Sequence, residues 1–153
     1  MSRPLRVLFL CTGNSARSQM AEAILRHIGK GAIEVESAGT VPQPHIHPMA
    51  RGAVKKLLDL DMDGQYPKTL DRFISQEFDY VITVCDQAAE RCPLFPRGRE
   101  RLHWSVEDPA AFIGTEDEKQ RAFDSTATDL VSRIRRWLSL PAVRNRVERA
   151  VGR

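Results

Sequence analysis

Apolar and polar positions along the chain follow two periods, one typical of strands and one typical of helices. Residues 5–10 are apolar at every position except Arg6, which predicts a buried strand. Shorter runs at residues 33–36, 79–84 and 101–104 predict three further strands. We therefore expect four short strands.

Apolar residues at helical spacing occupy the intervals between these runs. The first such stretch opens at Ser18 and stops at Gly29 and Gly31, because glycine commonly ends a helix. The second begins at Pro48, a residue favoured in the first turn. Its apolar face is formed by Ala50, Ala53, Val54, Leu57 and Leu58. Both stretches predict amphipathic helices.

A longer helix is predicted near the end of the chain. Thr115 with Glu118 three residues later forms a capping-box pattern, and Pro141 marks the end. The stripe between them consists of Phe123, Ala127, Leu130, Val131, Ile134, Trp137 and Leu138. A stripe of this length predicts a helix that covers the core.

The alternation of strands and helices predicts the topology. Strands that are joined through helices form right-handed crossovers, so we expect a parallel sheet in an α/β fold. Ligands of such sheets bind at the carboxyl ends of the strands. Cys11, Cys85 and Asp108 follow the first, third and fourth predicted strands. The sequence thus predicts a site that contains them.

Composition narrows the class of protein. The chain has 153 residues and 42% hydrophobic content, which predicts one compact domain over residues 1–140 and a basic tail at residues 141–153. We expect the arginines of the tail to form a solvated face. A net charge of +3 is too small to indicate nucleic acid as a partner. We see neither a signal peptide nor an apolar run of membrane-spanning length, and expect a cytoplasmic protein.

The strongest chemical signal is the segment from Cys11 to Arg17. A thiol and a guanidinium stand at the two ends of a short loop between a strand and a helix start, and between them lie Thr12, Gly13, Asn14, Ser15 and Ala16. Backbone N–H groups at a helix start bind anions, and an arginine clamps two oxygens of a tetrahedral oxyanion.

The same surroundings activate a cysteine. Helix N-termini and nearby cations lower the pKa of a cysteine thiol, and Ser18 is placed to donate a hydrogen bond to the thiolate. Gly13 and Asn14 are residue types that turn the chain with positive φ. The alternative is that Cys11 is a small buried hydrophobe. A nucleotide-binding Walker loop is excluded because no Gly-Lys-Ser/Thr follows.

Cys85 and Cys92 form a second candidate group. The three cysteines of the chain make no framework of secreted disulfides. On one continuous helix the Cα atoms of Cys85 and Cys92 would lie about 10 Å apart, whereas a disulfide needs less than about 7 Å, so pairing requires rearrangement. Alternatively both are core residues, or they bind zinc with His45 and His47, although no CxxC spacing supports such a site.

The sequence resembles a known family. Cys-Thr-Gly-Asn-Ser-Ala-Arg-Ser-Gln-Met-Ala-Glu at residues 11–22 is similar to the signature of thioredoxin-coupled arsenate reductases, which share a fold with low-molecular-weight protein tyrosine phosphatases. The resemblance covers most of residues 5–140, and its other matching segments are Ser37-Ala38-Gly39-Thr40, Val81-Ile82-Thr83-Val84-Cys85, Cys92-Pro93 and residues 103–110. It implies a three-layer αβα fold whose four-stranded parallel sheet has the order 2-1-3-4. Where the family usually has a second loop cysteine this chain has Ala16. That cysteine is not one of the family's reaction thiols, so its absence leaves the implied mechanism intact.

The resemblance also implies a reaction. Cys11 would attack arsenate, Cys85 would attack the Cys11 adduct and release arsenite, and Cys92 would take over the disulfide for reduction by thioredoxin. Asp108 would be the general acid, with Glu107 as a substitute, although Asp108-Pro109 is also a common turn. Phosphate and sulfate would compete with arsenate. The resemblance implies a role in arsenic detoxification, for which we expect neither a cofactor nor a metal.

Two departures from the family concern specificity and cations. Where the phosphatases often have a tyrosine that helps to bind aromatic esters, this chain has residues 110–112, Ala-Ala-Phe, which favours a small inorganic oxyanion. Some members hold potassium through residues that match Asn14, Glu22 and Ser37. The acidic residue that completes such a site is replaced here by Lys68, whose ammonium would take the place of the cation.

Two other functions remain open. The first is a phosphatase that acts on phosphotyrosine or small phosphoesters through Cys11, Arg17 and Asp108, without Cys85 or Cys92. The second is a protein without catalytic activity that binds oxyanions or senses redox state.

Overall fold

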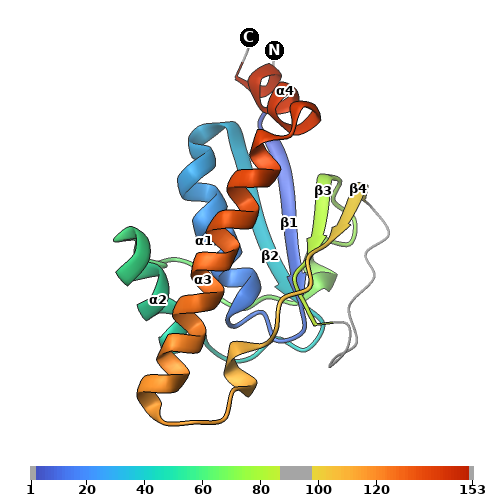
Figure 1. Ribbon diagram of the computed structural model, residues 1–153. Coiled ribbons are helices and arrows are strands. Elements are labelled where there is room, and N and C mark those ends of the chain that lie inside the picture. Colours follow the sequence, from blue (N-terminus) through green and yellow to red (C-terminus); the bar gives the residue numbers. More distant parts are fainter. Residues whose placement is uncertain (1–2, 87–97, 152–153) are drawn as a thin grey trace.

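A four-stranded parallel sheet forms the centre of the molecule. The computed structural model describes residues 3–86 and 98–151. The strand order is β2-β1-β3-β4, which confirms the expected sheet (Figure 1). The strands are β1 (Leu5–Cys11), β2 (Ile33–Gly39), β3 (Phe78–Thr83) and β4 (Gly98–His103). Each lies within a few residues of its predicted position.

Four α-helices accompany the sheet in the described ranges. They are α1 (Arg17–Gly29), α2 (Pro48–Leu58), α3 (Glu116–Ser139) and α4 (Pro141–Ala150), with short 3-10 helices η1 (Lys30–Ala32), η2 (Leu70–Phe73) and η3 (Pro109–Ala111). The capping box is confirmed, because Thr115 Oγ1 accepts from the Glu118 N–H at 3.1 Å and Glu118 Oε1 accepts from the Thr115 N–H at 2.9 Å. No helix within these ranges is long and apolar enough to cross a membrane.

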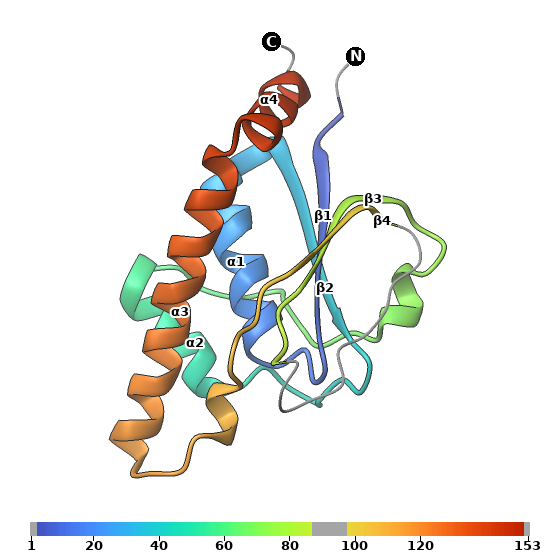
Figure 2. The ribbon, with the colours of Figure 1, turned by 45° about the vertical axis from the view of Figure 1, so that its right-hand side comes forward.

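The sheet divides the core into two clusters. Alternate residues of β1 point to opposite faces, so Phe9 joins the larger cluster and Leu8 the smaller one. Helices α1, α2 and α3 cover the larger cluster, and α1 and α3 lie side by side across that face (Figures 1 and 2). Phe73 of η2 packs on the opposite face. The strand ends that carry the site are therefore supported by packing on both faces of the sheet.

Helix α4 is fixed to the sheet through a buried carboxylate. Asp79 in β3 pairs with Arg146 of α4 at 3.3 Å and with Arg3 at 3.0 Å, and it accepts from the Arg6 N–H at 2.8 Å. The expectation of a solvated face is therefore wrong for Arg146, which an ion pair with a residue far away in the sequence draws inward. Val143 of the same helix is buried. The boundary at residue 140 stays a prediction.

Candidate active site

A cavity of about 460 Å³ opens at the carboxyl end of β1, where the chain enters α1. In Figure 1 this is the end of the sheet opposite to the two chain termini. The cavity is lined by residues 11–17 together with Val41, Gln43, His47, Asp108 and Ala110. The structure thus brings Cys11, Arg17 and Asp108 together, as the sequence predicts for strand ends of a parallel sheet.

The loop of residues 12–16 is held from outside through its carbonyl groups. The N–H groups of Val41, Gln43 and His47 donate to the carbonyls of Thr12, Gly13 and Ser15 at 3.0, 2.9 and 2.9 Å. Because the C=O and N–H of one peptide unit point in opposite directions, carbonyls that face outward turn the following N–H groups toward the sulfur and the cavity. The segment that leads from β2 to α2 therefore orients the amides of the loop.

Two positions in and beside the loop require an unusual backbone or a close approach. Asn14 has φ of 50°, as expected, whereas Gly13 is not among the residues with positive φ, so that part of the expectation is wrong. A Cβ at Gly13 would instead lie 3.2 Å from the side chain of Gln43. At Gly39, a Cβ would lie 2.4 Å from the Thr12 carbonyl oxygen, so only glycine fits where β2 passes the loop.

Hydrogen-bond donors surround the sulfur of Cys11, which is buried. The Asn14 N–H donates to Sγ at 3.1 Å, and the Ser18 hydroxyl lies 2.8 Å from Sγ. Since Asn14 Nδ2 donates to Ser18 Oγ at 2.7 Å, the hydroxyl proton of Ser18 is free to point at the sulfur. These donors hold the sulfur at the cavity where it can act as a nucleophile.

Arg17 and Asp108 also line the cavity. The guanidinium of Arg17 is buried and donates to the Val106 carbonyl at 2.9 Å, while its Nη2 lies 4.0 Å from Asp108 Oδ2. The Asp108 side chain is 40% exposed and caps η3 by accepting from the Ala110 N–H at 3.0 Å. Glu107 is exposed and does not line the cavity. The geometry thus favours Asp108 over Glu107 as an acid.

A network of buried polar groups links the loop to a second cavity. Asn14 uses its whole amide: Nδ2 donates to Ser18 and Ser37, and Oδ1 accepts from the Lys68 N–H at 2.8 Å and from Gln19. Ser37 donates to Glu22 Oε1 at 2.6 Å. These bonds fix the side chain that sets the turn of the loop.

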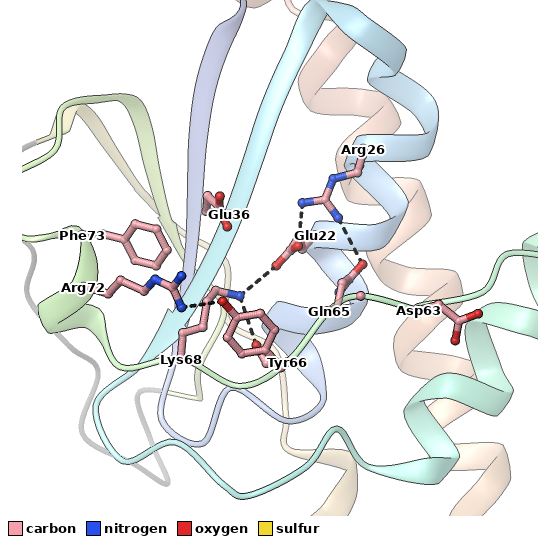
Figure 3. A pocket seen from close by; sticks show the side chains of 10 residues that line it. Glu22, Arg26, Glu36, Asp63, Gln65, Tyr66, Lys68, Arg72 and Phe73 are labelled. Atoms are coloured by element: carbon pink, nitrogen blue, oxygen red, sulfur yellow. Dashed lines mark hydrogen bonds and ion pairs between the residues drawn. The ribbon is translucent and has the colours of Figure 1, made fainter.

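The second cavity has a volume of about 340 Å³ and contains the expected ammonium group (Figure 3). Lys68 Nζ lies 3.7 Å from Glu22 Oε1, and both side chains are buried. It also donates to the Tyr66 carbonyl at 3.1 Å, while Arg26 pairs with the other Glu22 oxygen at 2.6 Å. The ammonium of Lys68 thus lies beside the Glu22 carboxylate, and its role in place of a cation stays a prediction.

Of the other two cysteines, the described residues include Cys85. Cys85 follows β3 and is fully buried. Cys92 lies outside the described residues. Ser18 contacts the sulfur without lining the cavity, while Thr12, Gly13, Asn14, Ser15 and Ala16 all line it.

Four lining residues lay outside the site that was predicted from the sequence: Val41, Gln43, His47 and Ala110. Val41 and Gln43 bind the loop through backbone groups, which leave no pattern in the sequence. His47 had a detectable signal, because His47-Pro48 stands where a helix N-cap is followed by its first residue. We expected His45 and His47 to be surface residues; His45 is exposed, whereas His47 is half buried.

Comparison with known proteins agrees with this geometry. Residues 6–150 match the model of the low molecular weight phosphotyrosine protein phosphatase family. An arsenate reductase of Halalkalibacterium halodurans is 38% identical over 129 residues, which cover 84% of this chain and 91% of the relative.

Two solved structures are similar as well. One is an arsenate reductase in the phosphate-binding state, with a TM-score of 0.72 and 26% identity. The match covers 88% of this chain and 97% of the chain of that reductase. A thioredoxin-dependent arsenate reductase of Corynebacterium glutamicum has a TM-score of 0.60 and 29% identity, over 88% of this chain and 63% of its own. With the sequence match spanning both the loop and Asp108, this chain belongs to the low molecular weight phosphotyrosine protein phosphatase family.

Proposed function

We propose that this protein is an arsenate reductase that uses Cys11, Cys85 and Cys92 in succession and is recycled by thioredoxin. The observation that carries the proposal is the Cys11 sulfur, which receives donors from Asn14 and Ser18 at a cavity that also contains Arg17. Relatives that are named arsenate reductases support the choice of substrate. The setting would be the cytoplasm, where thioredoxin keeps thiols reduced.

The shape of the cavity supports a small inorganic anion. Among the described residues that line it, the imidazole of His47 is the one aromatic ring. A phosphotyrosine ester would need apolar or aromatic walls for its ring. The loop amides and the guanidinium of Arg17 instead match a tetrahedral oxyanion, and phosphate and sulfate would compete for the same donors.

The first step forms a bond between sulfur and arsenic. The Cys11 thiolate attacks the arsenic of arsenate, and an arsenate oxygen leaves as water after Asp108 has donated a proton to it. The loop amides and Arg17 stabilise the charge on the remaining oxygens. Arsenic is still pentavalent in the resulting adduct.

Electron transfer follows in two thiol exchanges. Cys85 attacks Cys11 Sγ, a disulfide forms, and the electron pair of the S–As bond passes to arsenic, which leaves as trivalent arsenite. Cys92 then attacks Cys85, which releases the Cys11 thiolate and leaves a Cys85–Cys92 disulfide. The dithiol of thioredoxin reduces this disulfide and becomes oxidised itself.

The test is arsenite production with thioredoxin, thioredoxin reductase and NADPH. We expect Cys11→Ser to abolish all activity. Cys85→Ser should lose arsenate reduction yet keep p-nitrophenyl phosphate hydrolysis, which also shows that the variant is folded. Cys92→Ser should complete at most a single turnover. Native rates of reduction in Cys85→Ser and Cys92→Ser would contradict the relay.

A phosphatase is the second candidate. Cys11, Arg17 and Asp108 share one cavity, and these three groups suffice for phosphoester hydrolysis without the other cysteines. We therefore expect phosphatase activity beside arsenate reduction. Anion binding without turnover of either substrate would instead indicate an oxyanion-binding protein or redox sensor.

A further inference from the structure

His47 lies between the main cavity and a smaller neighbour, because it lines both. The smaller cavity, of about 160 Å³, is lined by His47, Met49, Pro109, Ala110, Glu116, Lys119 and Phe123. His47 and Ala110 line both cavities. His47 therefore lines the same cavity as Cys11, Arg17 and Asp108.

The position of this ring is fixed on three sides. The His47 N–H donates to the Ser15 carbonyl at 2.9 Å, which ties its backbone to the anion loop. The ring packs on Phe123, with 4.5 Å between the ring centroids. Nδ1 accepts from the Met49 N–H at 3.1 Å and so caps α2. A ring held in this way is pre-organised for a contact in the cavity.

The cap determines the tautomer. A nitrogen that accepts a hydrogen bond carries no proton, so Nδ1 is unprotonated and the neutral ring carries its proton on Nε2. Nε2 is thus an N–H donor, and within the described residues it has no hydrogen-bond partner in the protein. Donors at the wall of an anion site are used by the anion or by water.

We propose that His47 is an oxyanion-binding residue, whose Nε2–H donates to an oxygen of the bound arsenate or phosphate. This inference rests on the proposed chemistry at Cys11. The loop amides and Arg17 belong to the segment from Cys11 to Arg17, whereas His47 belongs to the segment that holds the loop from outside. His47 would thus contact an oxygen that the loop amides leave free.

Two substitutions separate this role from capping. His47→Asn keeps the cap, because asparagine is among the best N-cap residues, but places no donor at the position of Nε2. His47→Gln places an amide N–H near that position and is a poor cap. The two variants should therefore fail in different measurements.

The experiment is calorimetric titration of each folded variant with inorganic phosphate, together with its melting temperature. For His47→Asn we expect only a small fall in melting temperature, from the lost packing on Phe123, and phosphate affinity that is about tenfold weaker, since a hydrogen bond to a charged group is lost. For His47→Gln we expect a lower melting temperature and phosphate affinity closer to native. Native affinity in His47→Asn, or affinity that only follows melting temperature in both variants, would overturn the proposal.

A spectroscopic measurement needs no functional variant. In ¹H–¹⁵N correlation spectra of the native protein, the His47 signals should show the tautomer protonated at Nε2, and that nitrogen should shift when phosphate is added. A proton on Nδ1, or no response to phosphate, would contradict the proposal. Phosphate binding requires no arsenate turnover. The binding result therefore tests the role of His47 even if the protein does not reduce arsenate.

Discussion

The Ser18 hydroxyl lies 2.8 Å from the Cys11 sulfur and at the same time accepts a hydrogen bond from Asn14 at 2.7 Å. The second bond decides the direction of the first. Because the Asn14 amide occupies a lone pair of the hydroxyl, the hydroxyl proton is available to the sulfur. Ser18 is therefore a donor to the thiolate.

Ser18→Ala should slow alkylation of Cys11. The substitution removes a hydrogen bond to the charged nucleophile, and we expect the rate with iodoacetamide at neutral pH to fall about tenfold. Mass spectrometry of the Cys11 peptide measures this rate. Ser132→Ala, a change at an exposed position of α3, serves as control. An unchanged rate in Ser18→Ala would show that the hydroxyl does not stabilise the thiolate.

Lys68→Met should make the melting temperature of the protein depend on potassium. The substitution removes an ammonium that lies 3.7 Å from the buried Glu22 carboxylate, and a monovalent cation can then occupy the space. We expect the melting temperature of this variant to rise when potassium chloride replaces tetramethylammonium chloride, and that of the native protein to stay unchanged.

Glu22→Gln combined with Lys68→Met is the matched control for that measurement. The double variant has no carboxylate to neutralise, so its melting temperature should not respond to potassium. A marked response of the native protein would mean that Lys68 does not take the place of the cation.

Asp108→Asn should separate catalysis from binding. The amide cannot donate a proton to a departing oxygen, so we expect kcat for p-nitrophenyl phosphate to fall about 10²-fold or more. The inhibition constant of phosphate should change little, since the loop and Arg17 remain. Glu107→Gln, at an exposed position outside the cavity, should retain native kcat. If Glu107→Gln instead shows the loss, the acid is Glu107.

Asp79 should make the free energy of unfolding depend on pH in the acid range. Burial raises the pKa of this carboxyl, but hydrogen bonds from Arg3 and the Arg6 N–H, with the charges of Arg3 and Arg146, outweigh burial and lower the pKa below its usual value. A lowered pKa in the folded state stabilises the protein above the ordinary pKa of aspartate, and this contribution is lost as pH falls through the lowered value.

Urea unfolding of native protein and Asp79→Asn measures this effect. At pH 7 the variant should have lost about 2 kcal/mol of unfolding free energy, and the difference should shrink below about pH 4. A difference that is the same at pH 7 and pH 3 would show that the charge of Asp79 is not responsible.

Features with a short-range pattern could be predicted from the sequence. The buried run of β1, the capping box at Thr115 and the loop that starts at Cys11 each lie in a few consecutive residues. Strand order followed from the resemblance rather than from pattern, and the structure confirms it. Lys68 was found because it replaced an expected acidic residue.

Features that depend on contacts between residues far apart in the sequence could not be predicted. The bonds from Val41 and Gln43 to the loop join main-chain atoms, for which any side chain serves. Arg146 pairs with Asp79 from 67 residues away, and nothing in the basic tail distinguishes it from its neighbours. The place of Gly39 beside Thr12 likewise became visible only in three dimensions.

The carbonyls of the loop of residues 12–16 face outward, so its N–H groups are what the loop offers to an anion. This limits which anions the enzyme can tell apart. Peptide N–H groups respond to the charge and shape of their ligand, and arsenate and phosphate are both tetrahedral anions of similar size and charge. A cradle made of main-chain groups therefore offers little basis for choosing between them at the moment of capture. Selection between the two elements would then arise afterwards, because thiols reduce pentavalent arsenic and leave pentavalent phosphorus unreduced.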